Sequence, residues 1–168
     1  MNFNSKPPIR NAPAQQFTRA NQAWAVDHAV LDFPQRIFVR LVTEVGTRRP
    51  LSATLTFGIA DIGTGLERMV DRSGRPEQIW LDNYYKARSD PALKSWTERH
   101  RISIIYVPMQ TLQMKSLSER LLGDLSAYLR DKRFPTLMEL GHDIEHWRQR
   151  YCAAAQPFAT SISKRSTR

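Results

Sequence analysis

The chain has 168 residues, 41% of them hydrophobic, which suits one domain that buries a core without disulfides or a structural metal. Its formal net charge of +9 favours nucleic acid as a partner, because phosphates accumulate near clustered cations and release counterions on binding. No apolar run approaches the roughly 20 residues that a membrane-spanning helix needs, and no signal peptide is recognisable at the start. The single cysteine, Cys152, can form no internal disulfide. We therefore expect a cytoplasmic protein with no membrane partner.

The first part of the chain has the apolar and polar alternation of β-strands. Residues 1–20 are rich in Asn, Gln and Pro, and we expect a disordered arm there, because they bury too little apolar surface to offset the cost of ordering. Strand character then runs through residues 24–33, 36–43 and 49–57, which contain many β-branched residues. Short turns join these segments, and they predict antiparallel pairing.

Beyond Gly58 the apolar spacing becomes that of helices separated by short strands. The pattern predicts helices over residues 59–71, 91–100 and 136–151, a further helix that follows a loop at 109–113 and runs to about residue 132, and strands over 77–81 and 101–107. Thr136 and Glu139 stand in the capping-box positions of the last helix. A helical crossover into residues 77–81 favours parallel pairing with the first strand. We therefore predict a core domain over residues 21–155 and a disordered basic tail over 156–168.

This order of elements predicts an α/β fold with a five-stranded mixed sheet, in which three antiparallel strands are followed by two parallel ones and helices flank both faces. It is also the order found in ribonuclease-H-like domains. Because one fold can serve many functions, the chemistry has to be argued from particular residues.

Two aspartates stand on strands that the prediction makes neighbours. Asp27 lies inside the first strand, where an ionised side chain either has a partner or faces solvent. Asp82 ends the fourth strand, and sites in α/β sheets form at the carboxyl ends of strands. If these two strands pair in parallel, both carboxylates lie within reach of one ion.

A third acid, Glu119, lies on the predicted helix that follows the loop at 109–113. The helical wheel puts Leu117, Leu121, Leu125 and Tyr128 on one face, and Lys115, Glu119, Gly123, Ser126 and Arg130 on the opposite face. Glu119 then either forms only a surface pair with Lys115 or supplies a metal ligand beside bound phosphates. Three carboxylates would suit two Mg²⁺ ions, which prefer oxygen ligands and activate the oxygens of phosphodiester transfer.

These acids stand in motifs that resemble the DDE transposases and retroviral-type integrases of the rve superfamily, with bacterial insertion-sequence and Mu-type transposases most similar. Positions 83 to 118 number 36, close to the habitual spacing of that family. The likeness covers residues 24–151. The matching pieces are Trp24-Ala25-Val26-Asp27-His28, Thr47-Arg48-Arg49, Leu81-Asp82-Asn83, and Lys115 followed by Glu119-Arg120.

The resemblance implies a ribonuclease-H-like fold and an enzyme of DNA transposition or integration, which cleaves and transfers phosphodiester strands. It implies that Asp27, Asp82 and Glu119 are the catalytic residues and metal ligands, and that two Mg²⁺ or Mn²⁺ ions bind together with DNA. The expected partners are DNA, as transposon ends and target, and further copies of the chain in a homo-oligomer. Cationic residues near the acids are expected to bind DNA: Lys86, Arg88, Lys115, Arg120 and Arg130.

The chain departs from the family pattern between the second and third acids. After Asp82-Asn83 the family usually has Gly and an acidic-aromatic pair, whereas Tyr84, Tyr85, Lys86 and Arg88 follow here. The alternative is therefore a catalytically decayed integrase-fold module that binds DNA or a transposase partner. In that case the two tyrosines would stack on bases, or the segment is a simple surface loop.

A further alternative is a zinc peptidase, because His142, Glu145 and His146 fit the H-x-x-E-H pattern. On a helix both histidines would face the same way and could hold Zn²⁺. Such enzymes need another acidic ligand downstream, and no Asp or Glu follows His146. A polar helix face is the preferred interpretation.

Overall fold

Nine elements follow one another in the predicted order in the computed structural model. It describes residues 17, 19–33, 35–58, 62–82, 90–107 and 112–154, without the side chains of residues 32, 82, 112–115 and 118. The described elements are β1 (Ala23–Asp32), β2 (Arg36–Glu44), β3 (Arg49–Thr56), α1 (Ile62–Ser73), β4 (Gln78–Asp82), α3 (Pro91–His100), β5 (Ser103–Val107), α4 (Leu112–Leu129) and α5 (Leu137–Ala154).

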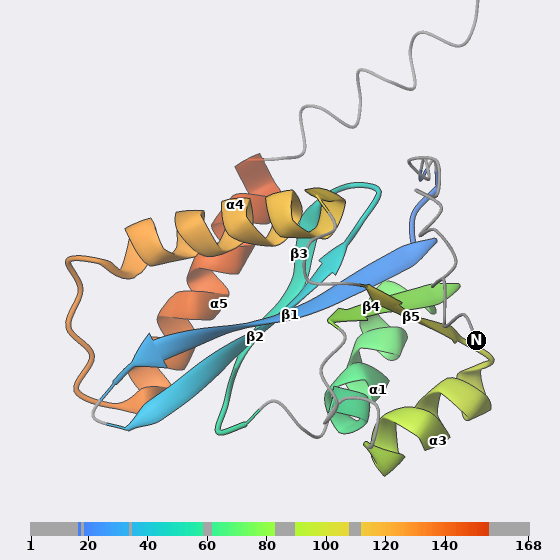
Figure 1. The fold of residues 1–168 in the computed structure, drawn as a ribbon. Coiled ribbons are helices and arrows are strands. Elements are labelled where there is room, and N and C mark those ends of the chain that lie inside the picture. The colour runs from blue at the N-terminus through green and yellow to red at the C-terminus, as the bar shows by residue number, and fades with distance from the viewer. Residues whose placement is uncertain are drawn as a thin grey trace, which may run out of the picture.

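The five strands form one mixed sheet in the order β3-β2-β1-β4-β5 (Figure 1). β1 and β3 pair antiparallel with β2, whereas β4 pairs in parallel with both β1 and β5. The predicted sheet, including the parallel pairing of the first and fourth strands, is therefore confirmed. The crossover through α1 carries the chain from the edge strand β3 to the far side of β1.

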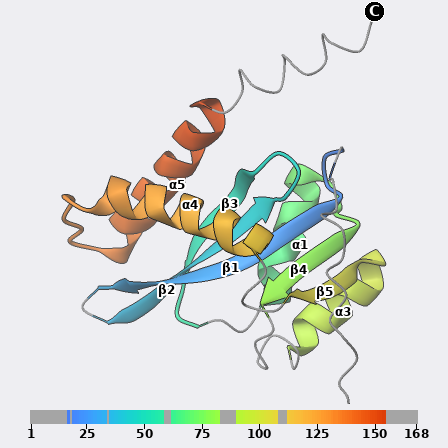
Figure 2. The same ribbon diagram turned by 45° about the horizontal axis from the view of Figure 1, so that its top comes forward.

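Helices cover both faces of the sheet, with α4 and α5 on one face and α1 and α3 on the other (Figures 1 and 2). Alternate residues of β1 divide between the two cores, because successive side chains of a strand point to opposite faces. Ala23 and Ala25 join the core beneath α4 and α5, while Trp24 and Val26 pack with α1 and α3. This division also fixes the face on which each later position of β1 lies.

The starts of the last two helices can be compared with the prediction. α5 has the predicted capping box, in which the Glu139 N–H donates to Thr136 Oγ1 and the Thr136 N–H donates to Glu139 Oε2, both at 3.2 Å. α4 begins at Leu112, within the loop over residues 109–113 that the sequence predicts ahead of this helix.

The predicted disordered arm over residues 1–20 and the predicted tail over 156–168 lie largely outside the described residues. Of the arm, Phe17 packs edge-on against Trp80, with their ring centroids 5.2 Å apart. Arg19 forms an ion pair with Glu77 at 3.0 Å, so chain contacts with the core begin before residue 21. No helix in the described part of the chain is long and apolar enough to cross a membrane.

Candidate active site

Asp27 and Asp82 occupy matching positions on neighbouring parallel strands. The pairing of β1 with β4 runs as far as Val26 opposite Leu81, and the two aspartates follow directly. β4 ends at Asp82, while β1 continues, with Asp27 opposite Leu41 of β2. Paired strands lie about 4.8 Å apart, so the backbones of positions 27 and 82 are neighbours. The predicted adjacency of the two strands is confirmed.

Asp27 lies on the sheet face that α4 covers. It is two and four residues beyond Ala25 and Ala23 on the same strand, and both alanines belong to the core beneath α4 and α5. Asp27 is half-buried, and its Oδ1 accepts the His28 N–H at 2.7 Å. The side chain of Asp82 lies outside those that the structure describes.

α4 presents Glu119 on the exposed face that the helical wheel predicts. Leu117, Leu121 and Leu125 are buried, whereas Glu119, Gly123, Ser126 and Arg130 are exposed. The helix lies across β1 (Figure 2), so Glu119 is on the same side of the sheet as Asp27. The described side chains form no cluster of three His, Cys, Asp or Glu residues that could hold a metal, and this set excludes Asp82. The triad therefore stays a prediction.

The edge at which β4 ends is electrostatically suited to anions. Asn21, just before β1, donates to the Ser73 carbonyl at the end of α1 at 2.7 Å, so the beginning of α1 points toward the opposite edge. α3 and α4 follow parallel strands and also begin there. Helix N-termini carry partial positive charge and attract phosphates, but at α1 and α3 the buried Asp90 carboxylate already accepts the N–H groups of Ile62, Ala92 and Leu93, which leaves the N-terminus of α4. Arg120 on α4 and Arg130, directly after its end, are exposed. The side chain of Lys115 is not described, and Lys86 and Arg88 lie outside the described residues.

His28 and Arg40 form a pair behind Asp27, on the other face of the sheet. Arg40 is 6% exposed and donates from Nε to His28 Nε2 at 3.1 Å. Burial of the imidazole, helped by the nearby guanidinium and opposed by Asp27, lowers the pKa of His28 from 6.5 to about 4. His28 is therefore a neutral acceptor at physiological pH, a role that a histidine in an alternating strand does not reveal from sequence.

We expect the free energy of unfolding to fall as the pH decreases from about 6.5 to about 4. In this window the unfolded chain protonates His28 while the folded chain does not, so acid favours unfolding, and below the folded pKa the effect ends. The pKa difference corresponds to at most about 3 kcal/mol. Urea unfolding at pH 7.5, 5.5 and 4.5 measures it. His28→Gln should flatten this part of the profile, and an unchanged slope would contradict the assignment.

Two acids outside the triad have structural partners. Glu44 is buried and accepts the N–H groups of Gly46 and Thr47, so it holds the turn between β2 and β3. Glu145 forms a two-pronged ion pair with Arg148, with both N···O distances 2.7 Å, and this pair lowers the pKa of the Glu145 carboxyl. The general base that a zinc peptidase would need is thus bound to an arginine, which favours the polar-face interpretation.

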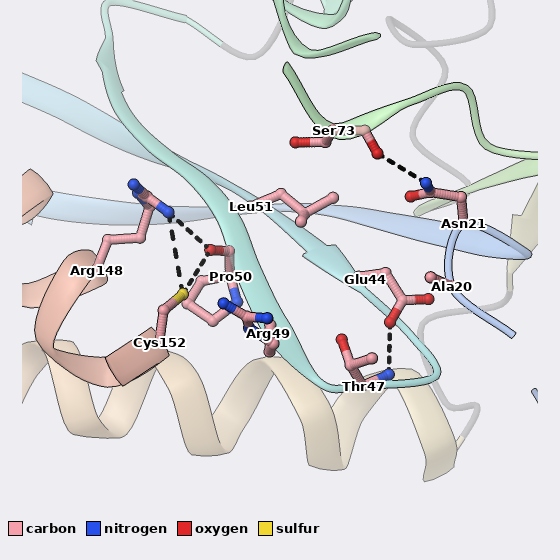
Figure 3. Close-up of a pocket in the computed structure, with 10 residues that line it drawn as sticks. All are labelled: Ala20, Asn21, Glu44, Thr47, Arg49, Pro50, Leu51, Ser73, Arg148 and Cys152. Atoms are coloured by element: carbon pink, nitrogen blue, oxygen red, sulfur yellow. Dashed lines mark hydrogen bonds between the residues drawn. The ribbon is translucent and has the colours of Figure 1, made fainter. Parts of the chain in front are cut away.

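A hollow of about 290 Å³ lies at the other end of the sheet (Figure 3). Glu44, Arg49, Arg148 and Cys152 are among its lining residues. The Cys152 thiol donates to the Pro50 carbonyl at 3.4 Å and lies 3.9 Å from Arg148 Nη1. Its walls come from the residues just before β1, the turn between β2 and β3 with the start of β3, the end of α1, and α5. The hollow is therefore separate from the edge at which β4 ends.

The comparisons with known proteins find similar structures but no similar sequences. No protein-family model matches the chain, and no curated protein matches it significantly in sequence. The HTLV-2 integrase catalytic core domain, in its dimeric form with magnesium, has a TM-score of 0.58 at 14% identity over 76% of this chain and 82% of that one. The BIV integrase catalytic core domain has a TM-score of 0.60 at 12% identity, covering 76% and 81% of the two chains.

A third match is a chain from the simian T-cell lymphotropic virus intasome in complex with the PP2A regulatory subunit B56 gamma, with a TM-score of 0.63 at 16% identity. It covers 77% of this chain and 49% of that one. At such identities the likeness shows the fold alone. The chain therefore has a retroviral integrase-core, ribonuclease-H-like fold, while the predicted closeness to bacterial transposases stays a prediction.

Proposed function

We propose that the protein is the catalytic core of a DNA transposase or integrase, which cleaves phosphodiester bonds and transfers DNA strands. The observation that supports this proposal is the parallel register of β1 and β4, in which Asp27 and Asp82 each follow directly after the last paired residues, Val26 and Leu81. Asp27, Asp82 and Glu119 would be the metal ligands. The integrase-core fold supports the proposal but does not by itself imply activity.

The donor set suits hard divalent cations such as Mg²⁺ or Mn²⁺. Carboxylate oxygens are the protein ligands that these ions prefer, and Mg²⁺ retains several waters, so three acids suffice. Two such ions, when bound with DNA, would activate the attacking water or 3′-hydroxyl and stabilise the leaving oxygen. The bond from the His28 N–H to Asp27 Oδ1 fixes this carboxylate on its strand, because it ties the side chain to the adjacent peptide.

Positive charge around the acids would bind and orient the DNA backbone. The net charge of +9 and the N-terminus of α4 both attract phosphates. Lys86, Arg88, Lys115, Arg120 and Arg130 would contact transposon ends or target DNA. A homo-oligomer is part of the proposal, and HTLV-2 integrase core domains are described in dimeric and trimeric forms. A cytoplasmic location stays a prediction.

The second candidate is a decayed module that binds DNA or a transposase partner without catalysis. It is favoured by the unusual residues after Asp82-Asn83, where Tyr84 and Tyr85 replace the residues that active relatives are expected to carry. Both candidates predict DNA binding. They differ in whether the acids bind metal.

Isothermal titration with Mn²⁺ separates the two candidates. We expect the wild-type protein to bind Mn²⁺ and Asp82→Asn to bind it at least about tenfold more weakly, because a neutral amide replaces a charged oxygen ligand. Asp124→Asn, at an exposed position of α4, is the matched control for loss of one charge and should bind like the wild type. Absence of wild-type binding, or equal weakening in both variants, would favour the decayed module.

A further inference from the structure

The hollow of about 290 Å³ near the start of β1 is built around the turn between β2 and β3 (Figure 3). Glu44, the last residue of β2, holds this turn, because its two carboxylate oxygens accept the N–H groups of Gly46 and Thr47. Arg48 lies in the turn in the left-handed region, with a φ of 59°, and Arg49 begins β3. Arg49 lines the hollow, whereas Arg48 is exposed and is not among the lining residues.

A second wall of the hollow comes from α5. Arg148 Nη1 donates to the Pro50 carbonyl at 3.4 Å, and the Cys152 thiol donates to the same oxygen at 3.4 Å. The two-pronged ion pair with Glu145 fixes the Arg148 guanidinium in this position. Arg148 and Cys152 point toward Pro50, next to Arg49 (Figure 3). Two guanidinium groups therefore border one hollow.

The hollow has spare hydrogen-bond donors, while its carboxylate is occupied. Glu44 is the only acid among the described lining residues, and both of its oxygens accept N–H groups of the turn. The side chain of Arg49 is half-buried and has no hydrogen bond or ion pair with any described residue. A guanidinium group carries five N–H donors and stays charged. Spare donors and a spare positive charge suit an anion.

Phosphate is the anion that this arrangement fits. The planar guanidinium group can donate two parallel N–H bonds to a phosphate group. The volume of about 290 Å³ lies at the lower end of the roughly 300–1,000 Å³ of small-molecule sites, so the hollow suits a small group. Arg148 lowers the pKa of Glu145 chiefly through its hydrogen bonds, and the charge of Arg72 adds to the effect. Arg72, in the last turn of α1, therefore adds positive charge near α5.

We propose that this hollow is a binding site for a phosphate group, with Arg49 as its main ligand and Arg148 as the second. It lies near the start of β1 and is separate from the edge at which β4 ends. The phosphate group belongs either to the DNA backbone or to a free phosphorylated molecule. The proposal concerns binding at a second site, so it does not depend on the proposed catalysis.

Titration of the full chain with inorganic phosphate, followed by amide NMR spectra, tests the proposal. We expect saturable shifts of the N–H signals of residues 47–49 and 148–152. Arg49→Gln should weaken phosphate binding by about tenfold or more, because a charge-assisted hydrogen bond is lost. Arg48→Gln removes the same charge from the neighbouring residue outside the hollow, and it should weaken binding by less than about threefold.

Both variants are expected to fold like the wild type. Neither Arg48 nor Arg49 has a side-chain hydrogen bond or ion pair with another described residue, so both variants should keep the wild-type melting temperature. Equal phosphate affinities of the two variants would overturn the proposal. Shifts that occur elsewhere but not in residues 47–49 and 148–152 would also overturn it.

Fluorescence anisotropy with a DNA duplex identifies the source of the phosphate group. If DNA supplies it, Arg49→Gln should lower the DNA affinity by about tenfold and Arg48→Gln much less. If a free phosphorylated molecule supplies it, both variants should lower the DNA affinity slightly and equally, while their affinities for inorganic phosphate still differ. Either result supports the site. Absence of DNA joining by the wild type would count against the proposed function and leave this test unaffected.

Discussion

Asp27→Asn and Glu119→Gln should each slow the joining of a labelled DNA end to target DNA by about 1,000-fold or more. Each substitution replaces a charged metal ligand by a neutral amide of nearly the same shape. A divalent cation contributes several kcal/mol of transition-state stabilisation, and each 1.36 kcal/mol corresponds to about a tenfold change in rate. Asp27 was chosen because it directly follows the residues of β1 that pair with β4. Glu119 was chosen because it lies on the exposed face of α4, on the same side of the sheet as Asp27.

The joining assay needs a control for charge and for folding. Asp124→Asn removes a carboxylate from the same helix as Glu119 and should retain wild-type joining. Circular dichroism should be unchanged in all three variants, since Asp27 is half-buried and Glu119 is exposed. Joining by Glu119→Gln at the wild-type rate would remove Glu119 from the catalytic set. Joining at the wild-type rate in both Asp27→Asn and Glu119→Gln would contradict the proposed mechanism.

Gly63→Ala should lower the free energy of unfolding by about 3 kcal/mol, a large part of the roughly 5–15 kcal/mol that stabilises a typical domain. The added methyl group would lie 2.5 Å from backbone atoms of Ala92 and Leu93, which no rotamer change can move. α1 and α3 must therefore separate at the end where Asp90 joins them. Urea unfolding followed by tryptophan fluorescence measures the change.

Gly123→Ala provides the matched comparison. Gly123 is also inside a helix, but a Cβ there would meet nothing within 4 Å. Alanine should therefore raise the free energy of unfolding by about 0.5–1 kcal/mol, because it has the higher helix propensity. Opposite signs at the two glycines would show that the effect at position 63 is steric. A stabilised Gly63→Ala variant would contradict the close approach of α1 and α3.

The fold could be predicted from the sequence because the patterns that indicate its strands and helices are local. Alternation in residues 24–57 and the helical spacing in 117–151 each depend on neighbours along the chain. Two general constraints then supplied the topology: short turns make antiparallel pairs, and a helical crossover returns to a parallel neighbour. The structure confirms both the order of elements and the pairing of β1 with β4.

Only part of the candidate site could be predicted from the sequence. Asp27 and Asp82 could be assigned to neighbouring strands because the predicted pairing of two strands determines which of their residues are adjacent. The role of Asp90 was not predicted, although Asp90-Pro91 ahead of an apolar run is a recognisable start of a helix. Its bond to Ile62 joins residues 28 positions apart, and no local pattern contains such a contact.

The sequence by itself determined the strands and helices, the mixed sheet and the three candidate acids, because periodicity, turn chemistry and motif spacing act over short stretches of chain. Only the tertiary structure decided that His28 is a neutral acceptor for Arg40, and that Asp90 joins α1 to α3. Burial and hydrogen-bond partners set these properties. Both arise from packing between elements, which becomes definite only when the whole chain has folded.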